Sequence, residues 1–202
     1  MKLLKVLIAV IVFPLSLSAQ INTDRVMAIG RNALYFEDYV LSIQYFNQVI
    51  NAKPYLYEPY FYRGLAKLNL DDFQGAESDC SLSIDRNPFV VSSYQVRGLA
   101  RINLDDYAGA VSDYEKALKY DPENIGIWHN LTLCRMQQKD WKGAESDLEK
   151  LLNVSPKYTK AYLLRGQVYL EQKDTVKAEA DYDKAISIDP YDGDAWSSRA
   201  GL

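Results

Sequence analysis

The chain has 202 residues, of which 48% are hydrophobic and 25% are charged, and its formal net charge at pH 7 is −4. This composition is typical of a globular or solenoidal protein and excludes a disordered chain and a collagen-like fibre. The acidic balance also argues against nucleic acid as a partner, because binding to phosphates needs clustered lysine and arginine side chains.

Residues 1–20 have the order of a secretory signal peptide. A short stretch with two lysines precedes the apolar run Val6 to Leu17, and small or polar residues follow it. The run is shorter than the roughly twenty apolar residues that a membrane-spanning helix needs. We therefore expect cleavage near Ala19 or Gln20, export to the periplasm or the medium, and a mature chain, residues 21–202, without a membrane span.

A period of 34 residues runs through the rest of the chain, and it is marked by Pro54, Pro88, Pro122, Pro156 and Pro190. Aromatic, glycine and alanine columns recur at the same period, for example Tyr60, Gly64 and Ala76 in the second repeat. Small and apolar residues advance by three or four within each repeat, which predicts two amphipathic helices. The repeats are 23–56, 57–90, 91–124, 125–158 and 159–192, and residues 193–202 begin a sixth.

This pattern resembles the tetratricopeptide repeat, which carries aromatic, Gly, Ala and Pro residues at fixed places in 34 residues. The resemblance covers residues 23–192. It implies an all-α, right-handed α-solenoid of five antiparallel helical hairpins plus a partial sixth. Such repeats bury their apolar faces only against their neighbours. We therefore expect residues 193–202 to fray and this repeat to allow self-association, and we expect either that the natural polypeptide continues beyond them or that the end at Leu202 is an artificial boundary.

Two kinds of charged column accompany the repeats. An aspartate precedes the second helix of every repeat and is predicted to be its N-cap: Asp38, Asp72, Asp106, Asp140 and Asp174. Arginines before the glycine column (Arg63, Arg97, Arg165) are followed sixteen residues later by Asp79, Asp113 and Asp181. We predict an ion pair within each repeat, rather than ligand-binding charges. Asp147 is then left without a partner, because Leu131 replaces its arginine.

Residues that could carry catalysis are scarce. The chain has one histidine, His129, and two cysteines, Cys80 and Cys134, which lie two repeats apart at different repeat positions. Their Cα atoms are predicted to be farther apart than the roughly 7 Å limit for a disulfide. The sequence shows no phosphate-binding loop and no zinc-ligand spacing. We therefore expect two free, buried thiols and neither catalysis, nor a metal, nor a cofactor.

In the family, the concave face made by the first helices binds peptides, and positions one and five after the aromatic column line it. Carried onto this chain, these positions are Phe61, Leu65, Gln95, Leu99, His129, Leu133, Leu163 and Gln167. This largely apolar face suits an extended or helical peptide. Further along the same face, Leu68, Ile102, Met136 and Leu170 are expected to belong mainly to the core between neighbouring helices.

Chaperone-binding members of the family carry a basic clamp on this face. Here only Asn130 and Lys160 resemble it, while Leu99 and Leu164 occupy places that would need polar or basic groups. Binding of chaperone tails is therefore not expected.

The sequence as a whole predicts a non-catalytic protein–protein interaction scaffold of the bacterial cell envelope with a protein or peptide partner. It is similar to exported tetratricopeptide proteins of Bacteroidota. An alternative is the N-terminal sensory ectodomain of a longer signalling protein, and a third is a module that recruits substrate to a hydrolase domain beyond Leu202. Two glycan motifs occur. Asp174-Thr175-Val176 resembles an O-glycosylation motif of exported Bacteroidota proteins, and Asn130-Leu131-Thr132 matches the N-linked sequon within a predicted helix.

Overall fold

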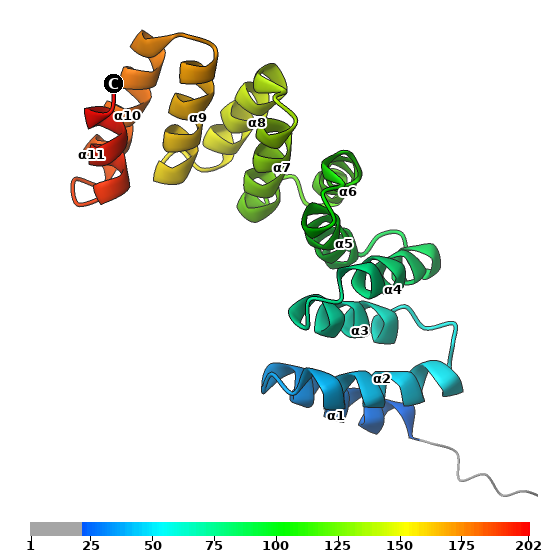
Figure 1. Ribbon diagram of the computed structural model, residues 1–202. Coiled ribbons are helices and arrows are strands. Elements are labelled where there is room, and N and C mark those ends of the chain that lie inside the picture. Colours follow the sequence, from blue (N-terminus) through cyan, green and yellow to red (C-terminus); the bar gives the residue numbers. More distant parts are fainter. Residues whose placement is uncertain (1–21) are drawn as a thin grey trace, which may run out of the picture.

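The computed structural model describes residues 22–202, so the expected signal peptide lies outside the described residues. Within this part every regular element is an α-helix (Figure 1). The first helices of the hairpins are α1 (Thr23–Tyr35), α3 (Glu58–Asn69), α5 (Val91–Asn103), α7 (Ile125–Gln137), α9 (Thr159–Glu171) and α11 (Gly193–Ala200). The second helices are α2 (Tyr39–Ala52), α4 (Phe73–Arg86), α6 (Tyr107–Tyr120), α8 (Trp141–Val154) and α10 (Thr175–Ile188). The expected all-α array of five hairpins and a partial sixth is confirmed for these residues.

The hairpins stack in sequence order into a bent array. Each helix contacts the next one along the chain, and α3 also contacts both α1 and α5. Figure 1 shows α3, α5, α7 and α9 on the inner side of the bend and α4, α6, α8 and α10 on the outer side. The first helices therefore form the concave face.

Local signals in the sequence fix where the helices begin and end. All five predicted aspartate N-caps are confirmed; Asp106, for example, accepts a hydrogen bond from the backbone N–H of Gly109 at 2.9 Å. The prolines follow the C-cap residues of the second helices, as Pro88 follows Asn87. Between the two helices of each hairpin one residue has a positive φ: Glu37, Asp71, Asp105, Lys139 and Lys173. Glycine usually takes such a left-handed position after a helix.

The glycine column lets the two helices of a hairpin approach closely. A Cβ atom added to Gly98 would lie 2.8 Å from the ring of Tyr114 on α6, and one added to Gly64 would lie 2.9 Å from the Cys80 sulfur on α4. Real Cβ atoms essentially never come this close to another side chain. The large, fully buried residue of the second helix thus packs directly on the backbone of the first.

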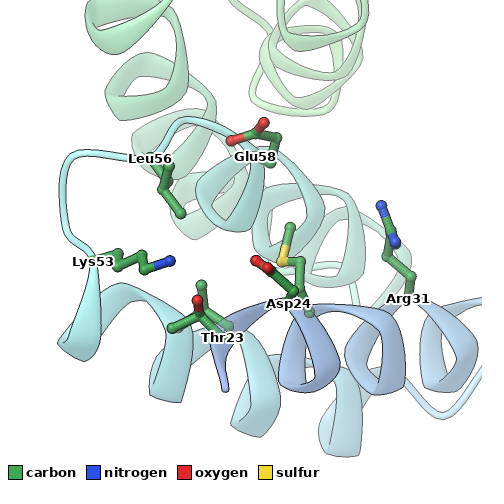
Figure 2. A pocket seen from close by; sticks show the side chains of 8 residues that line it. Thr23, Asp24, Arg31, Lys53, Leu56 and Glu58 are labelled. Atoms are coloured by element: carbon green, nitrogen blue, oxygen red, sulfur yellow. The ribbon is translucent and has the colours of Figure 1, made fainter. Parts of the chain in front are cut away.

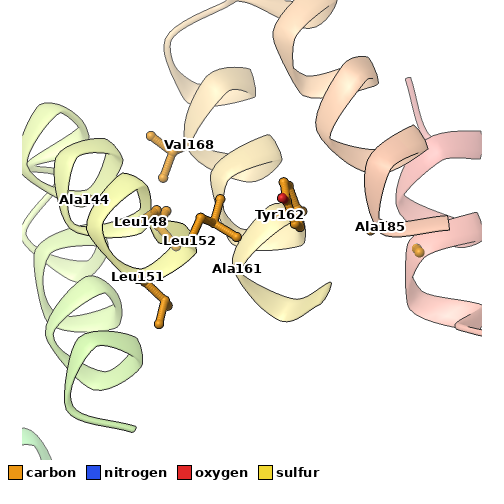
Figure 3. Close-up of a cluster of buried hydrophobic side chains, with 9 residues drawn as sticks. Ala144, Leu148, Leu151, Leu152, Ala161, Tyr162, Val168 and Ala185 are labelled. Carbon is orange, nitrogen blue, oxygen red and sulfur yellow. The ribbon is translucent and has the colours of Figure 1, made fainter. Parts of the chain in front are cut away.

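The core is a chain of local clusters rather than one central mass. The cluster in Figure 3 takes Ala144, Leu148, Leu151 and Leu152 from α8 and packs them against residues such as Val168 on α9. The same cluster extends to α10 and α11, and a separate cluster joins α5, α6 and α7. Each hairpin therefore buries its apolar face against its neighbours, as a solenoid requires.

The predicted ion pairs within the repeats are confirmed at three positions. Arg97 Nε and Nη2 donate to the two carboxylate oxygens of Asp113 at 2.9 and 2.6 Å. Arg63 and Asp79 form the same two-point contact, and so do Arg165 and Asp181. The four aspartates of this column, including Asp147, are at most 6% exposed.

The expectation that Asp147 lacks a partner is wrong. Arg135 Nε donates to Asp147 Oδ2 at 2.6 Å. Arg135 belongs to a second cation column, in which Arg101 and Lys67 bind Asp113 and Asp79, each at 2.9 Å. This column lies four residues after the first one, and residues four apart share one face of a helix. A buried aspartate can therefore be held from either position.

The first arginine column also reaches back to the preceding hairpin. Arg63 Nη1 donates to Asn47 Oδ1 at 2.6 Å, and Arg97 Nη1 donates to Ser81 Oγ at 3.0 Å. Arg199 on α11 binds Asp183 on α10 at 2.7 Å. These arginines thus join neighbouring hairpins as well as the two helices of one hairpin.

Both cysteines are free and buried, as expected. Burial raises the pKa of the Cys80 thiol to about 12 and that of the Cys134 thiol to about 11, so both are protonated at neutral pH. Among residues 22–202, none of the helices combines the length and the apolar character that crossing a membrane demands.

Candidate functional site

The eight residues expected to line the groove all lie on first helices. Phe61 and Leu65 are on α3, Gln95 and Leu99 on α5, His129 and Leu133 on α7, and Leu163 and Gln167 on α9. The spacing of four residues places the two members of each pair on one helix face. None of the eight is buried: Leu133 and Gln167 are exposed, and the other six are half-buried.

Three of these side chains meet in one cavity of about 350 Å³ between α7, α9 and α11. His129, Leu163 and Gln167 line it together with Lys160, Leu164, Asp194, Ser197 and Ser198. One wall is apolar and the rest is polar. The cavity therefore offers apolar contact next to hydrogen-bonding groups, one ammonium group and one carboxylate.

A second cavity of about 570 Å³ adjoins the first. It lies between the fourth and fifth hairpins and is lined by Met136, Gln137, Lys139, Trp141, Gln167, Leu170 and Glu171. Because Gln167 lines both cavities, they adjoin each other along α9, with Lys160 near the start of that helix and Leu170 near its end. The two cavities together form a trough on the concave side of the fifth hairpin.

The other five predicted residues line neither of these two cavities. Phe61, Leu65, Gln95, Leu99 and Leu133 lie on the preceding first helices, and the ring of Phe61 packs against that of Tyr62 at a centroid distance of 4.9 Å. They form an apolar band with one amide that leads toward the trough. Whether this band binds a ligand stays a prediction.

His129 is held in its neutral form at neutral pH. Burial lowers the pKa of its imidazole from the ordinary value of 6.5, and the nearby Lys160 ammonium lowers it further. The Tyr158 hydroxyl lies 3.4 Å from His129 Nδ1, and the two rings meet edge to face. A neutral imidazole beside a tyrosine can both donate and accept hydrogen bonds, so it suits a backbone amide of a bound chain.

Lys160 and Leu164, which the sequence placed at clamp positions of the concave face, line the first cavity, and the structure adds Asp194, Ser197 and Ser198 of α11. Lys160, Leu164 and Gln167 share a face of α9, because they are spaced by three, four and seven residues. This spacing was readable in the sequence. Ile102 and Met136 pack against buried clusters as expected, whereas Leu170 is 37% exposed and lines the second cavity, so its core assignment is wrong.

Both candidate glycan acceptor residues lie on helices. Thr175, which the sequence placed in an exposed hairpin loop, is exposed but is the first residue of α10, and Asn130 lies half-buried within α7, as the sequence predicted. The first cavity of the trough combines one lysine, the Asp194 carboxylate, one neutral imidazole, an amide and two hydroxyls with apolar walls. Among residues 22–202 there is no group of three or more His, Cys, Asp or Glu residues that could hold a metal ion.

Two sequence models described as tetratricopeptide repeat match the chain, over residues 103–167 and 159–192. No curated protein sequence matches it. These matches and the solved structures below support the tetratricopeptide repeat family.

Several solved structures share the fold. YrrB, described as a TPR protein with an unusual peptide-binding site, is 12% identical with a TM-score of 0.80, and the match covers 91% of this chain and 94% of YrrB. A MamA structure is 18% identical with a TM-score of 0.79 and coverages of 83% and 92%. MamA from Desulfovibrio magneticus RS-1 is 16% identical with a TM-score of 0.78 and coverages of 85% and 97%. At these identities the likeness concerns the fold alone.

Proposed function

We propose that this chain, whose fourth and fifth hairpins match tetratricopeptide repeats, is a non-catalytic protein–protein interaction scaffold of the bacterial cell envelope. Its concave face holds a peptide or a protein segment. The observation that carries the proposal is the trough on α9, where apolar side chains adjoin Lys160, His129 and Gln167. Peptide-recognition grooves combine apolar pockets with a few polar groups in this way.

The apolar band that leads to the trough supports a longer contact. Leu65, Leu99 and Leu133 lie at the same position of three successive first helices, and each keeps part of its surface accessible. An extended segment that crosses these helices can bury one side chain against each leucine. The likeness in fold to a structure described as peptide-binding is in keeping with this kind of partner.

The experiment is a selection of peptides from a displayed library on the purified chain, followed by calorimetry with one selected peptide. The groove variant carries Leu99→Asp and Leu133→Asp in the apolar band and Gln167→Ala in the trough, and it should bind the peptide at least tenfold more weakly. The matched control carries Val154→Asp and Val176→Asp, two exposed aliphatic residues on outer helices. It should bind as the wild type does. If the groove variant keeps full affinity while its circular dichroism is unchanged, the concave face is not the binding site.

Export is part of the proposal and rests on the sequence of residues 1–20. The measurement is fractionation of cells that express the full chain, together with N-terminal sequencing of the recovered protein. A start at or next to residue 21 and recovery outside the cytoplasm are expected. An uncleaved chain in the cytoplasm would refute the envelope location.

Self-association through the partial sixth repeat is the last part of the proposal. Trp196 on α11 is 54% exposed, whereas Tyr162 and Tyr94 at the same repeat position are 9% and 5% exposed. An aromatic ring of this size with half of its surface in water favours contact with a second copy. Sedimentation should show a concentration-dependent dimer that Trp196→Ala abolishes, and a wild-type monomer at all concentrations would contradict it.

A further inference from the structure

A separate cavity of about 370 Å³ lies between the first two hairpins, away from the trough on α9. Its lining comes from the start of α1, the end of α2, the turn that follows it and the start of α3 (Figure 2). The residues are Thr23, Asp24, Met27, Arg31, Val49, Lys53, Leu56 and Glu58, and none of them belongs to the predicted groove. The volume falls in the lower part of the roughly 300–1,000 Å³ that is usual for small-molecule sites.

Two acidic, two basic and three apolar side chains line the cavity. Asp24 and Glu58 bring two carboxylates, and Arg31 and Lys53 bring two cations. Met27, Val49 and Leu56 supply the apolar part. In Figure 2, Lys53 reaches from the end of α2 toward the side of the hollow where Asp24 lies, while Leu56 points down into it from the turn above.

None of these four charged side chains forms an ion pair with another described residue. The arginines of the first aspartate-binding column, such as Arg63 and Arg97, lie two residues earlier in the repeat than Arg31 and are by contrast bound to carboxylates. Asp24 and Glu58 are also favourable in the first turns of their helices, where the helix dipole attracts negative charge. The helix dipole does not explain why Arg31 and Lys53 line the same cavity.

The residues at the groove positions of the first hairpin differ in charge from those of the following hairpins. Arg31 occupies the repeat position of Leu65, Leu99 and Leu133, and Met27 that of Phe61 and Gln95. The first hairpin is therefore charged where the next three are apolar. A ligand that fits this cavity must carry charges of both signs, because a ligand with a single charge would leave either the acidic or the basic side chains without a partner.

We propose that this cavity binds a small zwitterion with an aliphatic side chain, that is, a free amino acid or a dipeptide. The ammonium group lies against Asp24, and the carboxylate accepts hydrogen bonds from Lys53, which reaches toward Asp24 in Figure 2. The side chain packs on Met27 and Leu56. The site shares no residue with the trough on α9, although Met27 and Arg31 lie at the places of the first repeat that correspond to the groove residues.

The experiment is calorimetric titration of the purified, processed protein with leucine and with leucyl-leucine, beside N-acetyl-leucinamide, which has the same side chain and no charge. At least one of the two zwitterions should bind saturably. The uncharged analogue should bind at least tenfold more weakly, and so should the zwitterion to Asp24→Asn and to Lys53→Gln. Asp24 is exposed and Lys53 is half-buried at the end of α2, so neither change should disturb folding.

The matched control variant is Lys160→Gln, which changes the other cavity and should leave zwitterion binding unaltered. Circular dichroism and melting temperature verify that each variant is folded. Absence of binding by both zwitterions, equal binding of the uncharged analogue, or an equal loss in Lys160→Gln would each overturn the proposal.

Discussion

Arg135 Nε lies 2.6 Å from Asp147 Oδ2, and this contact joins the two helices of the fourth hairpin. The Asp147 side chain is only 3% exposed. Burial raises the pKa of its carboxyl, and Arg135 acts in the opposite direction. The second cation, Lys150, is 3.5 Å away and 54% exposed. Arg135 is therefore the main compensation for a buried charge.

Replacement of Arg135 by methionine should destabilise the protein by about 3 kcal/mol, because it leaves the Asp147 carboxylate buried beside a single, half-exposed lysine. Urea unfolding monitored by circular dichroism measures the change. The double variant Arg135→Met, Asp147→Leu removes both charges and should recover most of the loss. A double variant as unstable as the single one would show that packing of the arginine stem, and not its charge, is what matters.

The same single variant should show a characteristic pH dependence. A folded-state pKa of Asp147 above the unfolded value means that the folded chain binds the proton more readily, so its stability rises as pH falls through the folded pKa. Loss of Arg135 raises this pKa further. The deficit of Arg135→Met relative to wild type should therefore shrink between pH 7 and about pH 4, and a constant deficit would contradict the assignment.

The contact between Gly98 and Tyr114 predicts a steric effect. Alanine at position 98 places a Cβ atom 2.8 Å from the buried ring, which has no room to move. We expect Gly98→Ala to lower stability by about 2 kcal/mol, in spite of the better helix propensity of alanine. Gly193→Ala is the matched control, because nothing lies within 4 Å of its added Cβ. Equal melting temperatures of the two variants would show that the glycine column is not sterically required.

Tyr114 also carries a buried hydroxyl that forms no hydrogen bond of good geometry with the described residues. Burial raises the pKa of Tyr114, although the Asn130 side chain lies close enough to act on this pKa in the opposite direction. Its replacement by phenylalanine removes an unsatisfied polar group and should stabilise the protein by about 1 kcal/mol. Tyr94 gives the matched control, since its hydroxyl donates to the backbone oxygen of Pro88 at 3.0 Å. Tyr94→Phe should destabilise by about 1 kcal/mol. If both variants lose stability, the Tyr114 hydroxyl has a partner that these contacts do not include.

His129 should make stability fall in mildly acidic solution. Its pKa is lowered in the folded state by burial and by Lys160, so the unfolded chain takes up the proton first as pH falls. Stability from this source is fully present above about pH 6.5 and is lost as pH falls toward the folded pKa. The melting temperature of the wild type should therefore drop more between pH 7 and about pH 5 than that of His129→Gln. Parallel curves would mean that the imidazole is not buried from water.

Much of the fold could be predicted because the repeat signals are local. Asp106 caps the first turn of its own helix. Gly98 packs against Tyr114, sixteen residues later, and the other glycines of this column face the residue at the same spacing. The groove residues were placed on one face by their spacing alone. Leu170 was assigned wrongly, because position along a helix does not tell how far the next helix covers it.

The amino-acid sequence by itself determined the number of hairpins, the ends of the helices and the residues that face the bend, since each depends on side chains within one 34-residue unit. Only the tertiary structure decided that Arg135 binds Asp147 where Leu131 replaces the usual arginine. It also decided that four charged side chains line one cavity and three groove residues line another. These features depend on how closely and at what angle neighbouring hairpins pack. That packing is the summed result of many contacts across the interface, and no single repeat carries it.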